Sequence, residues 1–191
     1  MKGRIFMYAS SSLLRRSQFA AVQLCEVRAE PMGIDVIVGD INDFKPDATF
    51  LGVLLPYPAT DGTIADFSGI TKQCKEHKVI SVFIADLLSL TILTPPGEMG
   101  ADIVVGNSQR FGVPLGYGGP HAAFLSCQDA YKRAVPGRII GLSRDASGDK
   151  AYRLALQARE QHIRREKANS NICTAQVPRP SRVRPVAQVG L

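Results

Sequence analysis

The chain has 191 residues, of which 45% are hydrophobic, and 23 Lys and Arg against 17 Asp and Glu give it a formal net charge of +6. This length suffices for one domain with a real core. Residues 177–191 hold three arginines and no acid, so half of the net charge lies there. The composition therefore gives little support for a nucleic-acid-binding face, which needs clustered basic residues. No apolar run approaches the ~20 residues of a membrane-spanning helix, and we expect a soluble protein.

The first 25 residues contain Lys2, Arg4, Arg15 and Arg16, several serines and no acid. This is the composition of a mitochondrial transit peptide. In a competing interpretation, residues 4–27 already belong to the folded domain.

Three elements are predicted next along the chain. Ile34–Val38 is expected to be a strand that ends at Gly39-Asp40, and Thr49–Leu55 a second strand that stops before Pro56. Residues 64–77 should form a helix, because four apolar side chains recur every three or four residues: Ile64, Phe67, Ile70 and Cys74.

Val79–Ala85 is an almost continuous apolar run, typical of a strand buried on both sides. Strands that alternate with helices predict an α/β fold with a mostly parallel sheet and crossover helices. Asp86 follows the buried strand, at the sheet edge where open α/β proteins bind ligands. Equally, Asp86 could cap a helix that begins at Leu87.

The segment from Gly100 to Phe124 is predicted to be a strand, a long loop and another strand. Ile103–Val105 and Ala122–Leu125 are the apolar ends, and five glycines and two prolines lie between them. Such a loop lets the backbone approach a ligand or a partner closely. The glycines Gly116, Gly118 and Gly119 could equally serve tight turns.

Beyond Cys127 the pattern predicts a short helix at Asp129–Arg133, a strand at Arg138–Ser143 and a turn at Ser147-Gly148. Asp149 is then expected to cap a last helix from Lys150 to about Lys167, with one apolar face: Tyr152, Leu156 and Ile163. The three prolines between Pro178 and Pro185 predict an extended or disordered tail. We therefore expect a domain over residues 1–176 and a tail over residues 177–191.

Four cysteines are spread along the chain with no CxxC pair and no histidine at metal-ligand spacing. We expect reduced, mostly buried thiols and propose no metal site.

Several long motifs together resemble one family. They are Leu-Thr-Pro-Pro-Gly-Glu-Met-Gly from Leu93, the glycine-rich segment from Gly100, Pro-Gly-Arg-Ile-Ile-Gly from Pro136, and Arg-Glu-Gln-His-Ile-Arg-Arg-Glu-Lys-Ala-Asn-Ser-Asn-Ile-Cys-Thr-Ala-Gln from Arg159. In this order they resemble the P-protein of the glycine cleavage system, a pyridoxal-phosphate-dependent glycine decarboxylase. The match is close from about Gly33 to Gln176 and looser before it. The resemblance also places a strand and a helix within residues 4–27, which we favour over a transit peptide; any true targeting segment would then be missing.

The resemblance implies part of an aminotransferase-like large domain, the type I fold of pyridoxal-phosphate enzymes. It implies a complete protein that is several times longer, with two related halves, which decarboxylates glycine and passes the aminomethyl group to the lipoyl arm of the H-protein. The family assembles as dimers or heterotetramers. The compartment would be the mitochondrial matrix in a eukaryote and the cytoplasm in a bacterium.

The resemblance also assigns candidate cofactor-binding residues. In the class, an Asp at the position of Asp86 pairs with the pyridine nitrogen of the cofactor. The family's Schiff-base lysine would fall near Gln109, yet no lysine occurs between Lys78 and Lys132. The chain thus resembles the half without the cofactor lysine, with no catalytic residue of its own and no covalently bound cofactor.

Arg110 and His121 are the other candidates for this degenerate site. Arg110 could bind a phosphate or carboxylate, although an acid across the domain interface is the partner we expect. His121, like Tyr117, could bind a ligand or serve a structural hydrogen bond. In the family view the partner of this chain is the lysine-bearing half. The alternatives are a non-catalytic α/β interaction or regulatory module and, less supported, a nucleic-acid binder that depends on the basic tail.

Overall fold

The computed structural model describes residues 3–9, 19–113, 123–135 and 138–157. The chain divides into two compact units, the first built on residues 1–126 and the second on residues 127–176. Within the described ranges, no helix combines the length and the apolar character that crossing a membrane requires.

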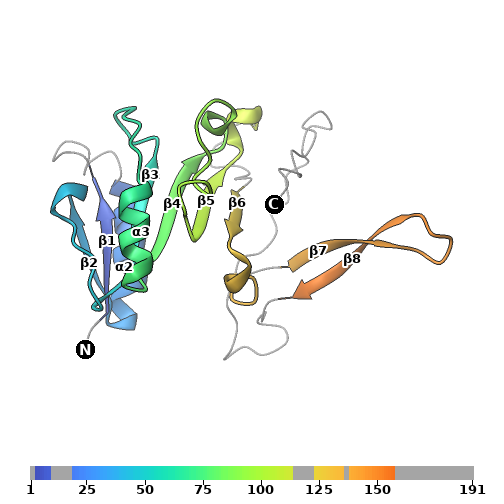
Figure 1. The fold of residues 1–191 in the computed structure, drawn as a ribbon, viewed down its shortest axis with the longest axis horizontal. Helices are drawn as coiled ribbons and strands as arrows, with labels where there is room; N and C mark the ends of the chain where they lie inside the picture. Colours follow the sequence, from blue (N-terminus) through green and yellow to red (C-terminus); the bar gives the residue numbers. More distant parts are fainter. Residues whose placement is uncertain (1–2, 10–18, 114–122, 136–137, 158–191) are drawn as a thin grey trace. The chain divides into compact units, whose positions relative to one another are not determined.

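The first unit contains a six-stranded sheet with the order β2-β1-β3-β4-β5-β6 (Figure 1). The pairs β1–β2, β1–β3, β3–β4 and β4–β5 are all parallel, which confirms the predicted mostly parallel α/β fold. The strands are β1 (Arg4–Tyr8), β2 (Asp35–Gly39), β3 (Phe50–Tyr57), β4 (Ile80–Asp86), β5 (Ile103–Asn107) and β6 (Ala123–Cys127).

Two helices make the crossovers of this sheet. Helix α2 (Phe19–Ala29) joins β1 to β2, and α3 (Ser68–Glu76) joins β3 to β4. In the sheet, β2 lies on one side of β1, whereas β4 lies beyond β3 on the other side. The two crossovers therefore run in opposite directions along the sheet, and right-handed connections place α2 and α3 on opposite faces (Figure 1). The direction of winding reverses between β1 and β3, and such a switch point leaves a crevice at the carboxyl ends of the strands.

Short 3-10 turns complete the described connections. They are η1 (Glu30–Met32), η2 (Ile41–Asp43), η3 (Ser89–Thr91), η4 (Gln109–Phe111) and η5 (Asp129–Tyr131). The last of these lies where a short helix was predicted at Asp129–Arg133.

The N-terminal strand and helix are confirmed. Strand β1 pairs with both β2 and β3, so residues 4–8 lie in the interior of the sheet. The interpretation of these residues as part of a transit peptide is therefore wrong.

The core lies between the sheet and its helices and is rich in aromatic rings. Phe83 of β4 is fully buried, and its ring meets those of Phe67 and Tyr57 edge to face, with centroids 5.7 and 6.2 Å apart. Phe6 stacks on Phe44 at 4.4 Å. These edge-to-face and offset arrangements are the favourable ones for aromatic pairs.

Two polar contacts hold β5 in place against β4 and α3. The Asp102 carboxylate accepts hydrogen bonds from the backbone N–H and the hydroxyl of Ser81, both at 2.9 Å. The buried Thr71 hydroxyl donates to the Met99 carbonyl at 2.5 Å. Because these polar groups are paired, burying them beside the core carries no unsatisfied-donor penalty.

Helix α3 begins four residues later than predicted. The Asp66 carboxylate accepts from the N–H and the hydroxyl of Ser68 at 2.8 and 2.6 Å. This local turn competes with helical hydrogen bonding ahead of Ser68. Phe67 and Cys74 are buried as expected, but Ile64 is outside the helix and 55% exposed.

Strands β3 and β4 also differ in detail from the prediction. Strand β3 continues through Pro56 to Tyr57. Its pairing with β1 ends at Leu54, so the missing N–H of Pro56 breaks no hydrogen bond with β1. In β4, Ser81, Phe83 and Ala85 are buried while the alternate residues are half-buried. One face of this strand is therefore more deeply covered than the other.

The second unit contains an antiparallel hairpin of β7 (Arg138–Arg144) and β8 (Lys150–Gln157). The predicted strand at Arg138–Ser143 is confirmed, but the predicted helix from Lys150 is wrong over Lys150–Gln157. A turn held by Asp145, whose carboxylate accepts from the N–H groups of Ser147 and Asp149 at 2.9 Å, returns the chain along β7. Pairing with β7 thus overrides the helical spacing. The remainder of that predicted helix and the tail of residues 177–191 lie outside the described residues, as does Cys173.

Replacing Phe83 by Ala should strongly destabilise the first unit. The substitution leaves a cavity between Phe67 and Tyr57, and such losses typically cost about 3–5 kcal/mol. Urea unfolding followed by circular dichroism measures the effect. The matched control is Ile92→Ala, because Ile92 is 87% exposed and should change the free energy of unfolding by less than about 0.5 kcal/mol. Equal effects of the two substitutions would contradict the assigned core.

Cys74 should resist alkylation in the folded protein. Burial, with a smaller contribution from the Asp102 charge, raises the pKa of its thiol to about 11, so only about one part in a thousand is thiolate at pH 8. Cys25 and Cys127 are half-buried free thiols and should react first. Timed iodoacetamide labelling with peptide mass mapping, with and without guanidinium, checks the order. Labelling of native Cys74 as fast as Cys127 would show that the site is open.

Candidate functional site

A cleft of ≈ 550 Å³ lies at the carboxyl ends of the central strands. Its position matches the switch point between β1 and β3, where open α/β sheets bind ligands. The residues that line it come from four strands, from the segments that follow three of them, and from helix α2: Met7, Ala21, Pro56, Pro58, Thr60, Ile84, Ala85, Asp86, Gly106, Asn107 and Arg110. The fold therefore places two of the predicted site residues, Asp86 and Arg110, in one cleft.

Asp86 ends β4 and uses both carboxylate oxygens. One oxygen accepts from the backbone N–H of Leu88 at 3.2 Å. The other oxygen accepts from the guanidinium of Arg110. The side chain is 25% exposed. No helix begins at Leu87, and the 3-10 turn η3 has Leu88 as its N-cap without a side-chain cap, so the predicted role of Asp86 as a helix cap is wrong. Asp86 thus lies at the edge of the sheet that lines the cleft, and its side chain makes a local contact with the turn that follows.

Arg110 follows β5 in the 3-10 turn η4 and forms an ion pair with Asp86. The predicted partner, an acid across a domain interface, is wrong, since both residues belong to the first unit. Parallel pairing explains the contact: Asp86 and Asn107 are register partners at the ends of β4 and β5, and Arg110 is only three residues further on. The Arg110 side chain is 64% exposed, so the pair is partly screened by water.

Gln109 takes a different direction from Arg110. Its backbone N–H donates to the Asn107 side chain at 3.1 Å, while its side-chain nitrogen Nε2 is buried without a hydrogen-bond partner among the described residues. Gln109 does not line the cleft. The position where the family resemblance would put a lysine thus carries an amide that points into the protein.

Among the residues that the structure describes, those that line the cleft include no lysine. The carboxylate expected to meet a cofactor nitrogen is instead bound to Arg110. These residues therefore do not fit a covalently held pyridoxal phosphate, because the covalent anchor is missing and the carboxylate is already paired.

Gly106 is a site residue that the sequence analysis missed. A Cβ atom there would overlap the Ala85 carbonyl oxygen and lie 2.6 Å from the Phe124 ring. Only glycine allows β5 to approach β4 and Phe124 so closely, and a glycine inside a strand is the sequence signal for such an approach. This close packing sets the position of the adjacent Asp86 and Asn107.

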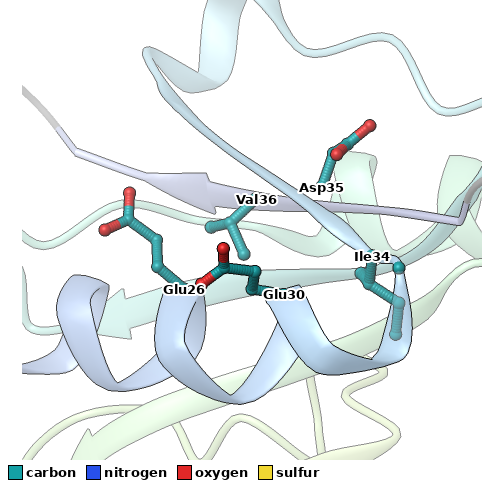
Figure 2. A pocket seen from close by; sticks show the side chains of 6 residues that line it. Glu26, Glu30, Ile34, Asp35 and Val36 are labelled. Atoms are coloured by element: carbon teal, nitrogen blue, oxygen red, sulfur yellow. The ribbon is translucent and has the colours of Figure 1, made fainter.

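A second hollow of ≈ 290 Å³ lies between α2, η1 and β2 and contains three carboxylates. Figure 2 shows Glu26 and Glu30 side by side on the helix, whereas Asp35 points away from them. The described residues contain no group of three potential metal ligands. The described part of this hollow therefore offers no converging set of groups for a metal ion.

The glycine-rich loop is only partly described. Gly112, with a positive φ of 92°, ends η4, and residues 114–122 lie outside the described residues. His121 and Tyr117 fall there, so their assignments stay predictions.

The chain matches the family model of the glycine cleavage system P-protein over residues 13–179. It is 56% identical over 156 residues to a glycine dehydrogenase (decarboxylating) from Synechocystis and 59% identical over 157 residues to one from Rhizobium etli. Each match covers 82% of this chain but 16% of the relative. The chain therefore spans about one sixth of the length of these relatives.

A solved structure gives the same assignment. The chain superposes with a TM-score of 0.74 and 32% identity on a crystal structure of glycine decarboxylase, the P-protein of the glycine cleavage system, in an inhibitor-bound form. The superposition covers 91% of this chain and 40% of that chain. It supports the fold and, with the sequence matches, the predicted family.

Substituting Gly106 by Ala should destabilise the first unit and disturb the cleft. Relief of the overlap with Ala85 and Phe124 requires a backbone shift, which typically costs about 1–3 kcal/mol. Thermal unfolding measures the loss. Gly97→Ala is the control, because a Cβ at Gly97 meets nothing within 4 Å. A Gly106→Ala protein as stable as the control would contradict the close packing of β4 and β5.

Proposed function

Because the chain belongs to the glycine cleavage system P-protein family, we propose that it forms part of a glycine dehydrogenase (decarboxylating). In this role the chain supplies scaffold and interface to the lysine-bearing half and does not carry out the decarboxylation itself. The resemblance extends over most of this chain but over only 16% of its relatives, so the activity belongs to a larger assembly.

The composition of the cleft carries this proposal. A binding crevice stands at the expected sheet edge, yet the residues that line it offer an ion pair and no lysine. Function depends on the residues of a site and not on the fold that presents it. A cleft at the sheet edge whose described lining lacks a lysine supports a non-catalytic role for this part of the protein.

Pyridoxal phosphate would supply carbanion stabilisation in the complete enzyme, held by the other half. No residue of this cleft is assigned a chemical step. Asp86 and Arg110 satisfy each other's charge at the carboxyl end of β4. The pair thereby links the end of β4 to the turn after β5, at a separation that the pairing of the two strands already sets.

The further partners follow from the family. The complete enzyme would act on glycine and pass the aminomethyl group to the lipoyl H-protein, in a dimeric or heterotetrameric assembly. It would work in the cytoplasm of a bacterium or the mitochondrial matrix of a eukaryote.

A second candidate is a non-catalytic α/β interaction or regulatory module. The paired state of Asp86 and Arg110 favours it as much as the first, since neither role needs a free catalytic group. The two functions differ in one property: only a supporting half restores decarboxylation when it is combined with a lysine-bearing half.

The purified chain should bind no pyridoxal phosphate covalently. Incubation with the cofactor, borohydride reduction and peptide mass mapping should show no stoichiometric adduct on one defined lysine, because no lysine is among the described residues that line the cleft. The control is a complete relative, the Synechocystis glycine dehydrogenase, which should gain one cofactor at one lysine. A stoichiometric adduct on one defined lysine of this chain would contradict the proposed supporting role.

Complementation separates the two candidates. Mixing the chain with the lysine-bearing half of the Synechocystis relative, with lipoylated H-protein, cofactor and labelled glycine, should raise the release of labelled carbon dioxide above that of either part alone. Unchanged release would favour the interaction module.

A further inference from the structure

The cleft at the carboxyl ends of the central strands has the size and the lining of a small-molecule site. Its volume is ≈ 550 Å³, within the roughly 300–1,000 Å³ range of ligand pockets. Most of the described residues that line it are apolar, with a few polar groups among them, and such a composition is typical of these pockets. The absence of a lysine from the described lining bears only on covalent binding, so the cleft is open to a ligand held by non-covalent contacts.

Charge limits which ligand this cleft can hold. Asp86 and Arg110 are the charged residues among the described ones that line it, so the described lining carries one negative and one positive charge. A phosphate ester would bring up to two negative charges beside the Asp86 carboxylate, and like charges in contact are unfavourable. A ligand with one cationic and one anionic group complements both residues.

The ion pair between these two residues can accommodate such a ligand. One guanidinium nitrogen of Arg110, Nη1, makes the contact with Asp86, whereas a guanidinium has five N–H donors. The side chains are 64% exposed for Arg110 and 25% exposed for Asp86, so a solute can reach both. A pair this exposed contributes little stability. Replacing part of it by contacts with a ligand therefore costs little.

The apolar part of the cleft favours a ligand with an apolar side chain. Met7, Pro56, Pro58 and Ile84 belong to this part of the lining, and removing apolar ligand surface from water against them is favourable. Glycine has no side chain and would leave these residues without a contact. The lining therefore favours an amino acid with a larger, aliphatic side chain.

We propose that the cleft binds, without covalent chemistry, the zwitterion of an α-amino acid with an aliphatic side chain of the size of leucine. The ligand carboxylate accepts hydrogen bonds from Arg110, its ammonium group donates to Asp86, and its side chain contacts the apolar lining. Charge-assisted hydrogen bonds at both charged groups fix the orientation of the ligand. This site goes beyond the proposed function, because it requires no lysine and holds no cofactor.

The test measures the binding of L-leucine to the purified full chain by isothermal titration calorimetry. Three analogues each lack one feature: 4-methylpentanoate lacks the ammonium group, 3-methylbutylamine lacks the carboxylate, and glycine lacks the side chain. We expect each analogue to bind at least about tenfold more weakly than leucine, since each loses either a hydrogen bond between charged groups or the burial of an aliphatic side chain.

Two variants test the ion pair itself. Asp86→Asn should weaken leucine binding about tenfold but strengthen the binding of 4-methylpentanoate, because it removes the charge that repels a carboxylate and releases Arg110. Arg110→Gln should weaken leucine binding and strengthen that of 3-methylbutylamine for the corresponding reason. A purely structural role of the two residues would not reverse these preferences. The matched control is Asp129→Asn, because Asp129 pairs with Lys132 and does not line the cleft; it should leave every affinity unchanged. Circular dichroism establishes that each variant is folded.

Three results would overturn the proposal. The first is no detectable binding of leucine to the wild-type chain, and the second is binding that Asp86→Asn and Arg110→Gln both leave unchanged, which would place leucine elsewhere. The third is glycine or inorganic phosphate binding at least as tightly as leucine, since the cleft would then not select an aliphatic zwitterion. None of these measurements involves a lysine-bearing half or decarboxylation, so the proposed function stands or fails separately through complementation.

Discussion

The close approach of β4 and β5 at Gly106 determines the geometry of the candidate site. A side chain at this position would overlap the Ala85 carbonyl and the Phe124 ring. Because Ala85 pairs with Gly106 and Asp86 with Asn107, the same approach fixes the separation of the next two residues. Arg110, three residues beyond, is thereby brought within reach of Asp86. The ion pair is a consequence of strand packing more than a cause of it, since a pair with an exposed partner contributes little by itself.

The aromatic core and the polar contacts around β4 also fix the position of this strand. Phe83 packs among aromatic rings on the buried face of β4, and Asp102 ties the start of β5 to Ser81. The strand is therefore fixed at its beginning by hydrogen bonds and along its length by apolar packing. Its carboxyl end is fixed by the close approach at Gly106 and carries Asp86, and there the cleft opens. A rigid scaffold that ends in an open edge is how parallel α/β sheets present a site.

The local sequence pattern predicted the strands of the sheet well. It failed where pairing with a separate strand determines the secondary structure. Ile34–Val38 and Val79–Ala85 have the apolar character and the flanking turn residues of strands, and both became strands. At Lys150–Gln157, Tyr152 and Leu156 fit a helical spacing, yet Tyr152 and Leu154 also fit the alternation of a strand, and only the register with β7 selects the strand. In the site, Asp86 could be placed from its strand alone. The contact of Arg110 with Asp86, like the close packing at Gly106, requires knowledge of which strands are neighbours.

The cleft and the hairpin have one physical feature in common, which is that each is open within the described residues. The cleft has the position of a binding site without the lysine that a covalently held cofactor needs, and the hairpin has exposed apolar side chains on both of its strands. Burial of those side chains on a partner would stabilise the folded hairpin by mass action, because anything that binds only the folded form shifts the folding equilibrium toward it. Binding and folding of the second unit would then be coupled.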